Sequence, residues 1–239
     1  KRLELPIVHN PCPVDGSTKR EEIKQLLRSL EHTNPGVRQR IFGAIQRYPL
    51  RGWAPDIYCM MSGIDRDTYD AVLFTGYHCG AKNPGNPLSH TMHRYVDSVL
   101  INGEPVSEFI INAYTAGYFG IPVCFISGDR AICAEAEAFV PGITAVPVVE
   151  GIGGGSISVQ PEQAAANIHA GVTAALAGDY RRCKVRMPET FEAEIGYASH
   201  IMAYQYSFYP GAEQRGSTRI SLRADSYLDV LRFFHFCGV

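Results

Sequence analysis

Two histidines and a glutamate lie close together in the sequence, in positions that suit a metal site. His78 follows the apolar run 71–77, His90 lies in the segment 86–92, and Glu108 stands where a helical pattern begins. In open α/β sheets, ligands bind beyond the carboxyl ends of the strands, which is where His78 is expected. Imidazole and carboxylate groups are common zinc ligands. Each residue also has a structural explanation, because lone histidines are often structural and a helix dipole favours a carboxylate in the first turn.

Other residues that could do chemistry fit the usual motifs less well. The glycine-rich stretch 151–156 is neither a dinucleotide-binding fingerprint nor a P-loop, since Ser156 replaces the third glycine and no Gly-Lys-Ser/Thr follows. Ser89 and Ser127 lie outside any Gly-x-Ser-x-Gly elbow. Cys79 could be an activated thiolate, but a buried structural cysteine is the commoner case. The sequence therefore favours metal chemistry over nucleotide binding.

Short apolar runs alternate with helical periodicity along the chain, which is typical of an α/β protein. The sequence predicts a mostly parallel or mixed central sheet flanked by helices, with a smaller C-terminal α+β portion. The Asn102-Gly103 pair predicts a tight hairpin, and Pro105 suits the first turn of the helix that carries Glu108. We expect strands at 72–74, 95–101, 122–127, 143–149, 190–197 and 218–222, a loop at 151–156, and helices at 18–34, 105–120 (with Ile110, Ile111, Tyr114 and Tyr118 toward the core), 130–140, 161–177 and from 225 onward.

Composition limits the classes of partner and compartment. The chain has 239 residues and a formal net charge of −2, which gives no attraction to nucleic acid or to an anionic membrane. No apolar run reaches the roughly 20 residues of a membrane span. Its seven cysteines are odd in number and lack Cys-x-x-Cys spacing, which favours a cytoplasmic location. We expect a main α/β domain at residues 1–178, diverged or incomplete over the first 50 or so, and a smaller portion at 179–239 packed on it.

Several short blocks follow one another in a fixed order along the chain. They are Arg51-Gly52-Trp53, Met60-Met61-Ser62-Gly63-Ile64-Asp65, Gly76-Tyr77-His78, Gly85-Asn86-Pro87-Leu88-Ser89-His90-Thr91-Met92, Ile101-Asn102-Gly103, Ser107-Glu108, Asn112-Ala113-Tyr114, Ser127-Gly128-Asp129 and Ser207-Phe208-Tyr209-Pro210-Gly211-Ala212. In this order they resemble the zinc-dependent D-aminopeptidases of peptidase family M55, and the resemblance covers roughly Arg51 to the C-terminus.

The resemblance implies a function and a role for each site residue. It makes His78 and Glu108 metal ligands and His90 the catalytic histidine, acting as base, as nucleophile or as donor to an oxyanion. It implies a zinc-dependent aminopeptidase that releases N-terminal D-amino acids from short peptides, and a ring-like homo-oligomer, a decamer in the type member. Zinc would polarise the scissile carbonyl and lower the pKa of a bound water toward about 7.

The sequence departs from the family pattern in its first part. The family opens with Ser-x-Asp-x-Glu-Gly and later carries Asn-Asp-Ser-His, and this sequence has neither. Three explanations are open: the N-terminal region is missing or altered, substitutes such as Asp15 and His32 complete the site, or the metal centre has been lost. In the last case the protein would be a catalytically impaired scaffold or peptide-binding protein.

Overall fold

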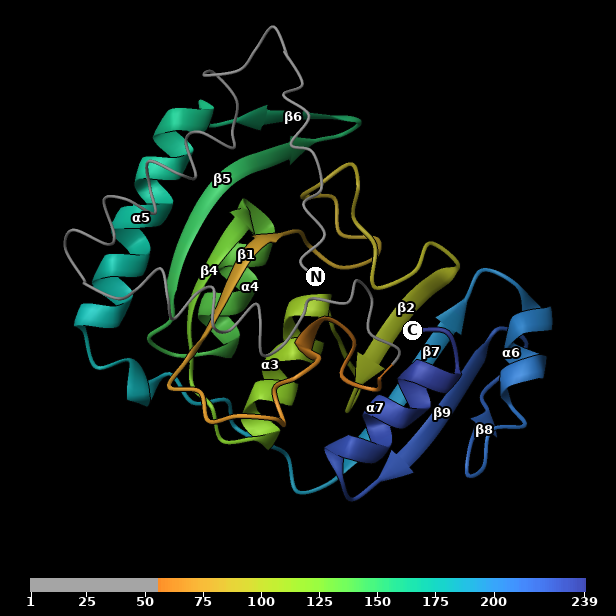
Figure 1. Cartoon of the computed structure of the whole chain (residues 1–239). Coiled ribbons are helices and arrows are strands. Elements are labelled where there is room, and N and C mark those ends of the chain that lie inside the picture. Colours follow the sequence, from red (N-terminus) through yellow and green to blue (C-terminus); the bar gives the residue numbers. More distant parts are fainter. Residues whose placement is uncertain (1–55) are drawn as a thin grey trace, which may run out of the picture. The chain divides into compact units, whose positions relative to one another are not determined.

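The computed structural model describes residues 56–239, which belong to one compact unit. The helix expected at 18–34 lies outside the described residues, as do Asp15 and His32. Within the described part the fold is α/β, as the sequence predicted, and the strands form two separate sheets (Figure 1).

The first sheet is mixed and has the order β1-β4-β5-β6. Strands β1 (Val72–Tyr77), β4 (Val123–Asp129) and β5 (Thr144–Ile152) are parallel, whereas β6 (Gly155–Ser158) pairs antiparallel with β5. Every residue of β4 is buried, as expected for a central strand of a parallel sheet. The carboxyl ends of β1 and β4 therefore lie side by side, and His78 follows directly after β1.

The second sheet is antiparallel and has the order β3-β2-β7-β9-β8. It consists of β3 (Glu104–Pro105), β2 (Val96–Ile101), β7 (Phe191–Tyr197), β9 (Arg219–Ala224) and β8 (Glu213–Gln214). Its strands thus come from both sides of the expected boundary at 178/179, and the division into two domains stays a prediction.

One helix connects the two sheets. Helix α3 (Glu108–Tyr118) packs against β1 and β4 of the first sheet and against α7 (Tyr227–Phe236), which itself packs on β7 and β9 (Figure 1). The hydroxyl of Tyr227 donates to the carbonyl of Ile111 across this contact, over 2.7 Å. The other helices are α4 (Arg130–Phe139), α5 (Pro161–Ala177), α6 (His200–Tyr206) and the 3-10 turns η1 (Cys59–Met61) and η2 (Tyr180–Arg182).

Three local expectations were wrong, and one helix was missed. Pro105 lies in β3 and not in the helix, because positive φ angles at Asn102 and Gly103 (53° and 83°) fold the chain back onto β2. The stretch 151–156 is a hairpin between β5 and β6 and not a loop. Tyr118 at the last position of α3 is 42% exposed, because the core contacts of that helix end before it. Helix α6 was not predicted, since its short sequence has little apolar periodicity.

Candidate metal centre

The structure brings His78, His90 and Glu108 into one group. One ligand atom from each residue lies within 4.8 Å of the other two. The imidazole rings of the two histidines are 4.3 Å apart between centroids, and Nε2 of His90 is 3.5 Å from Oε1 of Glu108. All three side chains are partly buried, with 41% of His90 and 12% of Glu108 exposed. The three side chains are therefore partly shielded from water and still accessible from the surface.

The two histidines lie in the connection between β1 and β2, residues 78–95, which contains no helix or strand. Connections of this length without secondary structure are uncommon in compact domains and are often functional. His78 begins the connection, and His90 lies where it returns toward α3. The backbone N–H of Met92 donates to Oε1 of Glu108 over 2.7 Å, which links the returning loop to the helix.

Helix α3 places Glu108 by its own N-terminal geometry. Ser107 is the N-cap, and its hydroxyl oxygen accepts from the backbone N–H of Ile110 over 3.4 Å. Glu108 is the first residue of the helix, where its carboxylate is favoured by the helix dipole. The expectation that Glu108 lies in the first helical turn is confirmed.

Both imidazoles have a defined tautomer. Nδ1 of His78 is 2.9 Å from the carbonyl of Cys79, and Nδ1 of His90 is 2.8 Å from the carbonyl of Leu88. A carbonyl oxygen only accepts, so Nδ1 must carry the proton in both rings. The lone pair of each neutral ring is then on Nε2, which is the arrangement that metal-binding histidines commonly use.

The donor set fits a divalent metal ion. Two imidazole nitrogens and one carboxylate oxygen are the usual protein ligands of catalytic zinc, with a fourth position left for water or substrate. A strict octahedral magnesium site would require more oxygen ligands than this group supplies. If His90 acts in catalysis instead, two of the described residues remain as ligands.

Two neighbouring hollows lie near this group. One, of about 440 Å³, is lined by residues of the histidine loop, among them His90, His93 and Arg94. The other, of about 350 Å³, has a mainly apolar lining from residues 56–59, from α3, and from α7 with the residues that follow it. Met92 and His93 line both hollows, so the apolar one lies next to the one that contains His90. A short peptide has room beside the candidate ligands.

The alternative nucleophiles are not equipped to react. Burial raises the pKa of the Cys79 thiol to about 12, and the nearby carboxylate of Asp129 adds to the rise, so the thiol is protonated at neutral pH. Ser127 is 1% exposed, and its hydroxyl has no hydrogen-bond partner within the described residues. Within the described residues the Ser127 hydroxyl thus has no hydrogen-bonded base to activate it, and the carboxylate beside Cys79 holds the thiol in its protonated form.

The same ancestry follows from comparison with known proteins. A family model described as D-aminopeptidase, of the peptidase M55 family, matches residues 48–236 of this chain. The chain belongs to the peptidase M55 family.

A curated and a structural relative agree with this membership. A D-aminopeptidase of Bacillus subtilis (strain 168) is 31% identical over 175 residues, which are 72% of this chain and 63% of the relative. A solved structure described as the Zn-dependent D-aminopeptidase DppA from Bacillus subtilis, a self-compartmentalizing protease, superposes with a TM-score of 0.69 at 28% identity. That match covers 76% of this chain and 66% of the other. The M55 chain thus spans just under two thirds of the length of these relatives.

The structure shows where the site residues expected from the sequence lie, and it shows further residues that contact them. His78, His90 and Glu108 converge, while the possible substitutes Asp15 and His32 lie outside the described residues. Sequence reasoning missed the Met92 amide and gave no role to Asp129, although the block Ser127-Gly128-Asp129 drew attention to it. No helix among residues 56–239 is long and apolar enough to cross a membrane.

Proposed function

We propose that this protein is a zinc-dependent aminopeptidase that releases N-terminal D-amino acids from short peptides. The observation that carries the proposal is the convergence of His78, His90 and Glu108 in a chain of the M55 family. The Bacillus subtilis structure described as a Zn-dependent D-aminopeptidase supports the choice of metal and of substrate class.

In this proposal His78 and Glu108 hold the metal and His90 serves the reaction. Zinc, when bound, supplies Lewis-acid polarisation of the scissile carbonyl and an acidified water. The Nδ1 proton of His90 is held by the Leu88 carbonyl. Its Nε2 is therefore available to take a proton from water and, once protonated, to donate it. The hollow that His90 shares with Arg94 lies open for the peptide.

Assembly and location form a second part of the proposal. We propose a ring-like homo-oligomer, because the structural relative is described as self-compartmentalizing. The six cysteines among the described residues are all free thiols, which supports a reducing compartment such as the cytoplasm. Sedimentation of the purified protein measures the assembly directly.

Metal content and product release test the catalytic proposal together. The wild-type protein should bind about one zinc ion per chain and release the N-terminal residue from a D-Ala-D-Ala type dipeptide faster than from its L-counterpart. His78→Ala should lose the metal and the activity while keeping the same oligomer. A zinc content below about 0.1 equivalent per chain would contradict the metal assignment, because functional sites fill nearly completely. Zinc binding without turnover of any aminoacyl peptide would instead favour the scaffold alternative.

A further inference from the structure

The carboxylate of Asp129 is buried behind the histidine group. Asp129 is the last residue of β4 and is 0% exposed. Its two oxygens have separate partners. Oδ1 accepts from the backbone N–H of Ile132 over 2.7 Å and so caps helix α4. Oδ2 accepts from the backbone N–H of Cys79 over 2.8 Å and from the side-chain amide of Asn86 over 3.1 Å.

The first bond from Oδ2 leads to His78. The N–H of Cys79 belongs to the peptide group that joins it to His78, and the carbonyl of the same Cys79 accepts the Nδ1 proton of His78 over 2.9 Å. The carboxylate therefore fixes the backbone of Cys79, and Cys79 in turn fixes the rotation of the His78 ring. Gly128 makes this approach possible, because a Cβ there would clash with the carbonyl oxygen of Tyr77.

The second bond from Oδ2 leads to His90. The amide of Asn86 donates to Asp129, and the Oδ1 of Asn86 accepts from the backbone N–H of Leu88 over 2.9 Å. The carbonyl of Leu88 then accepts the Nδ1 proton of His90 over 2.8 Å. Two chains of hydrogen bonds thus start at one carboxylate oxygen and end at equivalent atoms of the two histidines.

We propose that Asp129 is a positioning residue that sets the orientation and the tautomer of both His78 and His90. The inference rests on the proposed function, in which the Nε2 atoms of these rings face metal and substrate. A buried carboxylate suits this task because one oxygen can accept from two donors at once, whereas an amide nitrogen in the same place accepts from neither. Bonds to an ionised acceptor are also stronger than neutral ones.

If Asp129 had a purely structural role, its substitution would have a different effect. As an N-cap, Asp129 would act on the stability of α4 alone, through Oδ1. Asp129→Asn can keep this cap with its amide oxygen, but its NH₂ group then faces the donors of Cys79 and Asn86. The substitution therefore separates the two roles. Ser226→Ala is the matched control, since it removes the N-cap of α7, where the Ser226 hydroxyl accepts from Leu228 and touches no part of the histidine loop.

Zinc affinity, measured by competition with a chelator, is the first readout. We expect Asp129→Asn to bind zinc about 10–100-fold more weakly than wild type, as is usual when a group that orients a ligand is lost. Ser226→Ala should stay within about twofold of wild type even though it loses a helix cap. An affinity of Asp129→Asn within twofold of wild type would overturn the proposal. Wild type that binds zinc but cleaves no peptide would end the aminopeptidase proposal and leave this comparison intact.

The tautomers themselves are the second readout, and they require neither zinc nor turnover. In ¹⁵N NMR spectra of the metal-free protein at pH 8, His78 and His90 should both be protonated at Nδ1, and Asp129→Asn should convert both to mixtures. Asn86→Ala breaks only the second chain, so it should alter His90 and leave His78 as in wild type. This variant also decides the matter if Asp129→Asn does not fold. Unchanged His90 signals in Asn86→Ala would contradict the proposal.

Discussion

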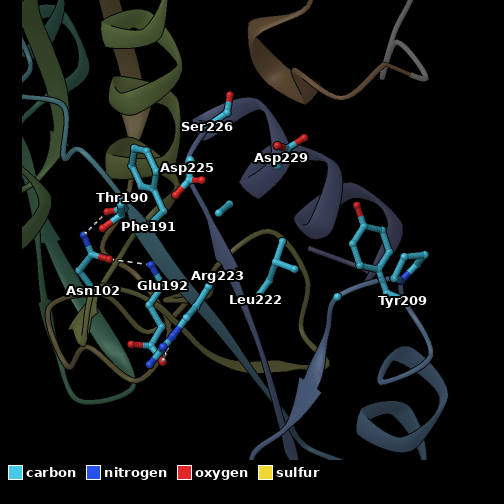
Figure 2. Close-up of a pocket in the computed structure, with 13 residues that line it drawn as sticks. Asn102, Thr190, Phe191, Glu192, Tyr209, Leu222, Arg223, Asp225, Ser226 and Asp229 are labelled. Atoms are coloured by element: carbon cyan, nitrogen blue, oxygen red, sulfur yellow. Dashed lines mark hydrogen bonds and ion pairs between the residues drawn. The ribbon is translucent and has the colours of Figure 1, made fainter.

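The hollow beside His90 and a larger hollow on the antiparallel sheet differ in size and in chemistry. The hollow of about 1040 Å³ in Figure 2 lies on the antiparallel sheet, between β7, β9 and the start of α7. Several of its polar groups pair with one another: the side chain of Asn102 bonds the backbone of Thr190 and of Glu192, and the carboxylate of Glu192 lies 3.8 Å from the guanidinium of Arg223. The hollow of about 440 Å³, by contrast, is lined by His90, which lies close to a second imidazole and a carboxylate.

The difference teaches that volume alone does not locate a site. Carboxylates such as Glu192 in the larger hollow already face cations of the same chain, so their charge is compensated. The ligand atoms of Glu108 and the two imidazoles instead lie within 4.8 Å of one another, an arrangement that a metal ion would stabilise. Matched substitutions in the two regions should therefore have very different consequences.

The largest effect is expected for His90→Ala. Loss of a catalytic acid or base should lower kcat about 10²–10⁴-fold, and zinc content should stay close to wild type because we assign His90 to the reaction. His200→Ala, at the start of α6, is the control and should leave kcat unchanged. The measurement is steady-state kinetics together with metal analysis of each variant.

If His90→Ala lost its zinc, the role of His90 would change, but the location of the site would not. It would make His90 the third ligand of the group, as the distances among the three ligand atoms also allow. Unaltered kcat and unaltered zinc content would remove His90 from the site altogether.

A smaller effect is expected for Glu108→Gln, which keeps the size of the side chain and can still accept from Met92. Replacing the anionic ligand by a neutral amide should weaken zinc binding by at least the roughly 10–100-fold that loss of a ligand-orienting group costs. The same substitution in the larger hollow, Glu192→Gln, should leave zinc affinity unchanged, because it removes only exposed ion pairs worth about 1 kcal/mol or less. Chelator competition on both variants makes the comparison. Equal zinc affinity in the two variants would contradict the placement of the site.

The smallest effect concerns Glu135, a partly buried carboxyl that accepts from Ser107 beside Glu108. Burial raises its pKa above the usual value of 4.5, so the folded state holds the proton more tightly than the unfolded state does. Stability is therefore lost as the pH rises through the folded pKa, and Glu135→Gln removes this loss. The Tm of metal-free Glu135→Gln should exceed that of wild type by about 1–3 °C at pH 7 and match it near pH 4.

Calorimetry at the two pH values checks this prediction. The exposed Glu192, whose carboxylate is not buried, provides the comparison, since Glu192→Gln should show no such gain at pH 7. A Tm gain of Glu135→Gln that is the same at both pH values would show that ionisation is not its cause.

The sequence predicted those parts of the site that depend on local signals. His78 follows a short apolar strand, and Glu108 follows the N-cap Ser107, so their positions could be read from neighbouring residues. The links from Asp129 to Cys79 and Asn86 could not, because they join residues 50 and 43 positions apart along the chain. Pro105 was misplaced for a different reason, because two local signals competed: pairing across the predicted Asn102-Gly103 turn outweighed the preference of proline for a first helical turn.

The long connection 78–95 carries both histidines without a helix or strand of its own. Segments of this kind open locally far more often than the sheets beside them. Because a metal ion bound by His78 and Glu108 favours the closed form over the open one, the opening becomes rarer as the ion binds. The rate at which a protease cuts this connection would then follow the supply of zinc around the protein, and the lifetime of the chain in a cell would be coupled to metal nutrition.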